Sequence, residues 1–216
     1  MANNSTAYGL IPVGLVGGSA NTTGVTEYEI ASDNTDAIFH GGICVPLAAG
    51  VITFAGATSG GTTQALGVLT GIEYVDSGTG KTVWKNYWPG SGSLSVDTNH
   101  PVKAFVADNP NQIFRVASDA TLTDVATAQA AVFANASLGT SARLGSTATG
   151  QSTAKLGVST IAVTATLPLR IVGIVKDEAN SDVTAAGYPL LVRLNAHFNA
   201  ATRGFASQST ADSTGI

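Results

Sequence analysis

Residues Ala65–Val75 read ALGVLTGIEYV, and this stretch predicts a long β-strand. Its internal glycines, Gly67 and Gly71, are typical of a bulge or of sharp coiling within a strand. The polar run Asp76–Gly80, DSGTG, is a turn signal, and Lys81–Trp88 returns as a second, aromatic strand. The stretch therefore predicts a β-hairpin, and the rest of the chain repeats this alternation of short strands and turns.

The rest of the chain shows the same pattern of short apolar runs separated by turn signals. This pattern predicts a mainly β protein with a compact antiparallel β-barrel or β-tulip-like body. The other strands are expected at Val25–Ile30, Ile43–Leu47, Val51–Phe54, Pro101–Val106, Gln112–Val116, Thr160–Lys176 and Tyr188–Asn195. The turn signal Asp108–Asn111 predicts that the strands on either side of it pair as a hairpin. Thr121–Ala136 is rich in alanine but interrupted by threonine and β-branched residues, so both a helix and a loop remain open there.

The chain divides into three parts on composition: an extended N-terminal arm at 1–24, a β-rich body at 25–198, and a flexible C-terminal tail at 199–216. The body carries a loop-rich insertion at 119–157. The arm contains one apolar patch, Tyr8–Val16, in which Pro12 and several glycines oppose a helix. We expect this patch to contact a partner and not the core of its own body. The candidate partner-binding residues are Tyr8, Leu10, Ile11, Pro12, Val13 and Leu15.

A weak internal similarity links Gly67–Ile72 and its following aromatic strand to Ile171–Val175 and Tyr188–Val192. Two related hairpins in one barrel would explain it, and so would the ordinary composition of β-strands. The sequence leaves both explanations open.

Charged residues make up 11% of the chain, against roughly 25% in an ordinary soluble domain. The small neutral residues that replace them suit broad contacts with other subunits. A net charge of −4, with basic residues scattered singly, argues against nucleic acid and anionic membranes as partners. No uncharged apolar stretch is long enough to span a bilayer, so we expect no membrane contact.

Three motifs suggest chemistry and fail on their spacing. Gly78–Thr82, GTGKT, lacks the upstream glycine and the following helix of a phosphate-binding loop. Asp33–Asp36 holds only fragments of a calcium loop. Cys44 and the three histidines offer no zinc spacing, and Cys44 reads as a buried apolar residue. We therefore expect no catalytic residues, no metal, no cofactor and no enzymatic activity.

The aromatic residues Tyr74, Trp84, Tyr87 and Trp88 gather around one predicted hairpin. Core packing together with a subunit contact is one interpretation, because Trp and Tyr are enriched at interfaces. A platform for carbohydrate, formed by Trp84, Tyr87 and Trp88, is the other.

The order of motifs along the chain resembles virion structural proteins of tailed bacteriophages. The residues that carry the resemblance are Gly41–Leu47, Gly50–Ile52, Gly67–Tyr74, Lys85–Pro89, Asp108–Val116, Gly150–Leu156, Leu169–Gly173 and Leu191–His197. The pair Gly41-Gly42 departs from the Gly-Asp that is common in this group.

The resemblance implies a capsid decoration, or cement, subunit that clamps neighbouring capsomers of the expanded shell. Its partners would be the major capsid protein of the shell and copies of itself, as a trimer rather than a dimer. Such a protein is made in the host cytoplasm and resides on the capsid surface of the virion. The alternative is a tail- or fibre-associated β module that binds host glycans.

Overall fold

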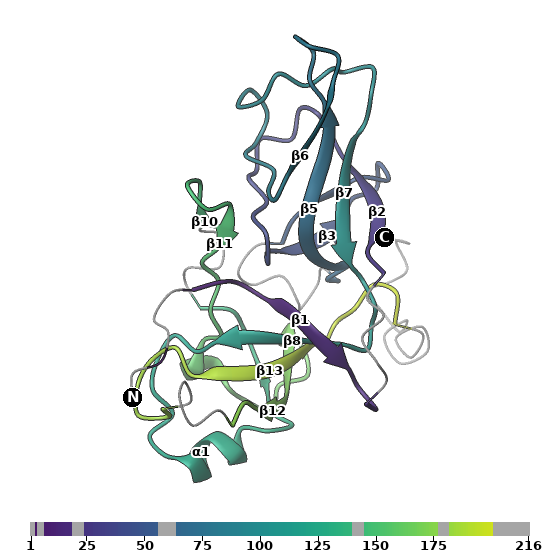
Figure 1. Ribbon diagram of the computed structural model, residues 1–216. Coiled ribbons are helices and arrows are strands. Elements are labelled where there is room, and N and C mark those ends of the chain that lie inside the picture. The colour runs from purple at the N-terminus through teal and green to yellow at the C-terminus, as the bar shows by residue number, and fades with distance from the viewer. Residues whose placement is uncertain are drawn as a thin grey trace.

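The computed structural model describes residues 3, 7–18, 24–55, 64–139, 145–176 and 182–200, and within them the protein is mainly β with antiparallel sheets (Figure 1). This confirms the expected fold class. Sheet A has the strand order β1-β8-β13-β12-β9, and sheet B has the order β2-β7-β5-β3-β4, with β6 also paired to β5. In the described part of the chain the end strands of neither sheet pair with each other, so both sheets are open.

The elements have the following bounds. In sheet A they are β1 (Ile11–Leu15), β8 (Gln112–Ala117), β9 (Asn135–Ala136), β12 (Leu169–Ile174) and β13 (Pro189–Leu194). In sheet B they are β2 (Thr26–Ile30), β3 (Ile43–Pro46), β4 (Ile52–Phe54), β5 (Gly67–Val75), β6 (Thr82–Lys85) and β7 (Val102–Ala107). A small hairpin of β10 (Gly145–Ser146) and β11 (Gln151–Ser152), the helix α1 (Val125–Ala130) and a 3-10 turn (Val158–Thr160) complete the set.

The hairpin predicted on either side of Asp76–Gly80 is confirmed. β3 and β4 pair antiparallel through a short turn, and β5 and β6 pair with Glu73 opposite Trp84. The Asp76 carboxylate accepts backbone N–H groups of Gly78 and Thr79, at 3.1 and 2.8 Å, which closes the β5–β6 turn. β12 and β13 form a third hairpin.

The predicted pairing of the two strands around Asp108–Asn111 is wrong. β7 pairs with β2 and β5 in sheet B, whereas β8 pairs with β1 and β13 in sheet A. The turn itself exists, since the Gln112 N–H donates to Asn109 O at 2.9 Å. It carries the chain from one sheet to the other, because each strand finds its apolar partners in a different sheet.

Within Thr121–Ala136, where both a helix and a loop were open, the structure has one short helix, α1. Asp124 caps α1 by accepting the Thr127 N–H at 2.7 Å, as Asp does at helix N-termini. The helix ends by Ala131, and Phe133 adopts a positive φ of 74°. The strand predicted over Thr160–Lys176 is also shorter in the structure, where Leu169–Ile174 forms the strand and Ala162 makes an isolated bridge to Asn135.

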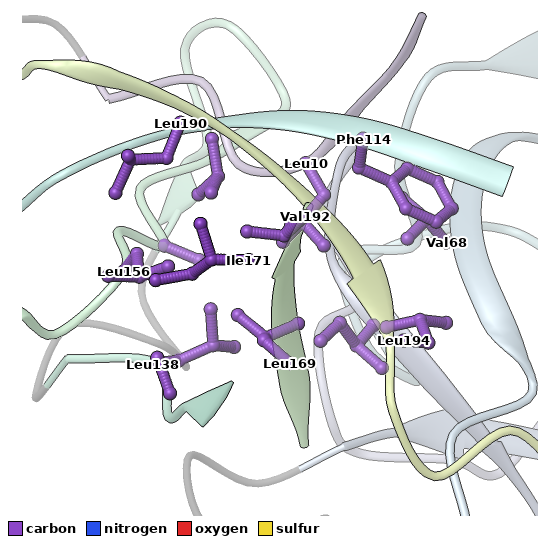
Figure 2. Packing of buried hydrophobic residues seen from close by; sticks show 14 of the residues in the cluster. Leu10, Val68, Phe114, Leu138, Leu156, Leu169, Ile171, Leu190, Val192 and Leu194 are labelled. Atoms are coloured by element: carbon purple, nitrogen blue, oxygen red, sulfur yellow. The ribbon is translucent and has the colours of Figure 1, made fainter. Parts of the chain in front are cut away.

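Two apolar clusters form the interior. One lies behind sheet A and gathers Leu10, Phe114, Leu169, Ile171 and Val192, all almost fully buried (Figure 2). The other lies on the opposite face of sheet B and centres on Leu69, Ile72 and Trp88. Each fully buried aliphatic side chain contributes about 1.5–3 kcal/mol through burial.

Sheet B also contributes to the first cluster through Ile43, Val45, Val68 and Ala107. One end of sheet B is therefore packed against the layer under sheet A, and the sheets share a core.

Three strands carry a one-residue shift of register, and each shift falls directly before a glycine. The extra residues are Val13 in β1, Thr70 in β5 and Val172 in β12. The last two belong to the pair of similar segments noted in the sequence. The segments lie in different sheets, so they are not two hairpins of one barrel.

Candidate partner-binding surfaces

The apolar patch near the N-terminus is a strand of the body. β1 lies at one end of sheet A and pairs antiparallel with β8, from Ile11 opposite Arg115 to Leu15 opposite Gln112. The Val16 N–H continues the contact by donating to Asn111 O at 2.9 Å. Pro12, which lacks an N–H, is tolerated because an edge strand leaves one side of its backbone unpaired.

Residues before β1 are fixed to the body. The Asn3 side chain donates to Asp182 O at 2.6 Å and accepts the Asp182 N–H at 2.7 Å, and two further contacts involve Leu10 and Gly9. Leu10 is 1% exposed and belongs to the core cluster, where Figure 2 shows it with Phe114 and Val192. Gly9 and Gly41 both have positive φ, and a Cβ on Gly41 would lie 2.8 Å from Tyr8 O. The expectation that Tyr8–Val16 stays out of the protein's own core is therefore wrong at Leu10, because the two glycines let the backbones approach and bring that leucine inside.

The remaining predicted partner-binding residues fall into two groups. Ile11, Pro12 and Leu15 are partly exposed, and Val13, the bulged residue, is 45% exposed. Together with Val16, at 43%, they form what we name the β1 strip.

Tyr8 is held differently. Arg115 Cζ lies 5.2 Å from its ring centroid. Burial raises the pKa of the Tyr8 phenol, and Arg115 partly offsets the shift. The Tyr8 ring therefore contacts Arg115 of the same chain, and this face of the ring is not open to a partner protein.

The predicted carbohydrate platform does not form from its three aromatic residues. Trp88 is fully buried, and its Nε1 donates to Asn34 O at 3.1 Å. Tyr87 is partly buried and stacks on Phe39, with ring centroids 5.2 Å apart. Trp84 is 63% exposed and points to the other face of sheet B. β6 ends at Lys85 and the chain bends at Asn86 and Tyr87. The regular alternation that would place Trp84 and Trp88 on one face therefore does not continue to Trp88.

Cys44, His40 and His197 do not form a catalytic arrangement. The Cys44 thiol is fully buried, which raises its pKa to about 12, so it is not a thiolate nucleophile. His40 Nδ1 contacts Thr70 O at 2.9 Å, and His197 is buried at the end of the body. Among the described residues, no group of three or more His, Cys, Asp or Glu side chains could hold a metal ion.

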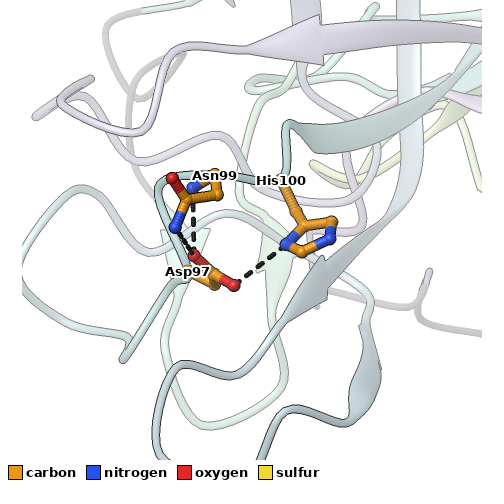
Figure 3. Close-up of polar contacts among 3 residues, drawn as sticks. All are labelled: Asp97, Asn99 and His100. Atoms are coloured by element: carbon orange, nitrogen blue, oxygen red, sulfur yellow. Dashed lines mark hydrogen bonds and ion pairs between the residues drawn. The ribbon is translucent and has the colours of Figure 1, made fainter.

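His100 has an acidic neighbour, but the pair belongs to a turn. Its Nδ1 lies 2.9 Å from Asp97 Oδ2, while Asp97 Oδ1 accepts the Asn99 N–H at 3.0 Å (Figure 3). The Asn99 N–H, with a further contribution from His100, lowers the pKa of Asp97. The three residues close the turn that leads into β7.

A second apolar surface, which no sequence pattern predicted, lies at the opposite edge of sheet A. Phe133 and Val163 are 80% and 92% exposed. They flank the antiparallel bridge between Asn135 and Ala162, beyond β9. Hydrophobic pattern alone could not find them, because both residues stand in irregular segments where no periodicity marks a face.

No family model, curated protein or solved structure matches this chain. Among the helices of the described residues, none has the length and apolarity needed to cross a membrane.

Proposed function

We propose that the protein is a structural subunit of a tailed-bacteriophage particle, a decoration subunit that binds the assembled head shell and stabilises it. The observation that carries the proposal is the β1 strip, an exposed apolar edge on a chain in which only 11% of residues are charged. Edge strands offer unpaired backbone groups as well as side chains to a partner. The partner in this proposal is the major capsid protein.

The mechanism is mass action. A subunit that binds only the expanded lattice lowers the free energy of that lattice and makes its disassembly harder. The β1 strip would bury Val13 and Val16 against the shell, and weak contacts suffice because many copies act together. Tyr8 and Leu10 would support the strip from inside the body rather than contact the shell.

The test uses particles of the virus that encodes the chain, prepared without the protein. We expect such particles to assemble and to release their genome at a lower temperature than complete particles. Adding back the purified protein should restore heat resistance, whereas the double variant Val13→Asp/Val16→Asp should not. Val125→Asp is the control, because Val125 is also an exposed valine, at 60%, but lies on α1.

Equal heat resistance with and without the protein would reject a stabilising role. Particles that keep robust heads but fail to adsorb to host cells would favour a tail-associated module instead. The burial of Trp88 removes the platform on which the glycan-binding alternative was based, so we do not advance that alternative.

A further inference from the structure

One face of sheet B is covered at one end and open at the other. At the covered end Val68 and Ala107 enter the core shared with sheet A. The bulge at Thr70 keeps Val68 and Glu73 on the same face, since the register continues from Leu69 to Gly71 across it. The open part of this face carries Glu27, Glu29, Glu73, Trp84, Lys103 and Phe105, and we name it the Trp84 shelf.

The strand register places these side chains in two rows. Glu29, Lys103, Glu73 and Trp84 are successive partners across β2, β7, β5 and β6. The second row runs from Glu27 to Phe105 and then to Gly71. Directly opposed side chains in antiparallel sheets lie close enough to interact.

The aromatic part of the shelf is preorganised. The rings of Trp84 and Phe105 stack with centroids 5.1 Å apart and planes 16° apart. They meet diagonally across β5, next to Gly71, which carries no side chain. Phe105 supports one side of the indole, yet Trp84 remains 63% exposed, so its other side faces solvent.

The charged part of the shelf is acidic. Lys103 Nζ lies 3.4 Å from Glu27 Oε1 and 3.8 Å from Glu73 Oε1. Glu29 adds a third carboxylate in register with Lys103. Three carboxylates against one ammonium leave the shelf negative, beside an open indole.

We infer that the Trp84 shelf binds a basic side chain of a partner protein, arginine in preference to lysine. Tryptophan is the strongest aromatic partner for a cation. A planar guanidinium can stack on the open indole and donate to the Glu73 carboxylate, which stands directly opposite Trp84. The inference is independent of the proposed function, because the shelf and the β1 strip belong to different sheets.

The chain contains two tryptophans, which gives a direct readout. In a ¹⁵N-labelled full-length protein the indole N–H resonance of Trp84 should shift on titration with the peptide acetyl-Gly-Arg-Gly-Arg-Gly-amide at low salt. That of buried Trp88 should not. We expect saturation in the millimolar range, weaker binding with lysine in place of arginine, and no shift with citrulline, the neutral isostere.

Substitutions on the Trp84 shelf test which side chains contact the arginine peptide. Followed through the backbone amides of β5 and β7, Trp84→Leu should weaken binding about fivefold and Glu73→Gln about threefold. Asp33→Asn removes an exposed carboxylate outside the sheet and should leave binding unchanged.

Equal response to the citrulline and arginine peptides would overturn the inference, as would the absence of any shift. A Trp84 shift with maltotriose but not with the arginine peptide would also overturn it and make the shelf a saccharide site.

Discussion

Single residues fix the N-terminal segment more firmly than its composition suggests. Gly9 and Gly41 pass each other at a distance that leaves no room for a Cβ on either. Gly50 has the same φ as Gly41, 79°, but has nothing within 4 Å of where its Cβ would be. Comparing alanine substitutions at Gly41 and Gly50 therefore distinguishes the free-energy cost of a left-handed backbone from the cost of a steric clash.

Gly41→Ala should destabilise the protein clearly more than Gly50→Ala. Both variants pay about 1–2 kcal/mol for an alanine at positive φ. Only Gly41→Ala adds a clash with Tyr8 O and Leu10 N, which has to be relieved by moving the segment that places Leu10 in the core. Urea denaturation measures the difference, and equal midpoints for the two variants would show that the contact between Gly9 and Gly41 is not maintained in solution.

His197 supplies a pH dependence. It is 2% exposed, its Nδ1 accepts the Asn199 N–H at 3.1 Å, and its Nε2 is buried without a hydrogen-bond partner. Burial lowers its pKa to about 4; Asp108 opposes this shift and Arg193 adds to it. The ring is therefore neutral in the folded protein at pH 5, whereas in the unfolded chain it binds a proton near pH 6.5.

Between about pH 6.5 and 4 the unfolded state binds more protons at His197 than the folded state does. The contribution of neutral His197 to the free energy of unfolding is therefore fully present above pH 6.5. It is lost as the pH falls toward 4, by at most about 3 kcal/mol. Thermal unfolding of His197→Asn across this range should show a shallower pH dependence than the wild type. His100→Gln, which removes an exposed histidine, should keep the wild-type slope. An unchanged slope in His197→Asn would contradict the assignment.

At the scale of elements, the sequence predicted what local signals determine. The turn Asp76–Gly80, rich in Gly, Asp and Ser, specifies a reversal of the chain, and the β5–β6 hairpin follows from it. The signal at Asp108–Asn111 is of the same kind, but a turn does not say whether its two strands pair or separate. That choice depends on distant partners, β1 and β13 on one side and β2 and β5 on the other.

The same limit explains the candidate surfaces. The sequence identified five residues near β1 whose side chains are partly or well exposed, or held at the surface by Arg115. It could not show that Leu10 turns inward, because the direction of one side chain there depends on the approach of Gly9 to Gly41. Trp84 and Trp88 are four residues apart and would share a face in a regular strand. The bend at Asn86 and Tyr87, which no sequence signal marked, leaves Trp84 exposed and Trp88 buried.

Deleting residues 2–18 should destabilise the protein, in contrast to what an independent arm would do. The deletion removes β1 and the buried Leu10. Truncating a buried leucine to alanine already costs about 2–5 kcal/mol. Leu10→Ala should therefore show much of the loss in urea denaturation, whereas Val16→Ser, at an exposed position, should stay within about 0.5 kcal/mol of the wild type. A truncated protein with an unchanged midpoint would show that the segment is an arm after all.

At the scale of the whole molecule, two antiparallel sheets share one apolar cluster, and sheet B packs a second cluster on its other face. Separate surfaces of the two sheets remain exposed. The β1 strip is apolar and lies at the edge of sheet A, and the Trp84 shelf is acidic and aromatic and lies on sheet B. A decoration subunit needs a rigid body with more than one contact surface, because it must hold neighbouring shell subunits together. The proposed function assigns the β1 strip to that role.

The most direct test of this proposal is the position of the protein on intact particles. In the proposed function the chain is encoded by a tailed bacteriophage, so particles of that phage would be labelled with antibody against the purified protein and viewed by electron microscopy. We predict label distributed over the heads, and its loss when the gene carries Val13→Asp/Val16→Asp. Label confined to tails or fibres, or particles that carry none of the protein, would contradict the account.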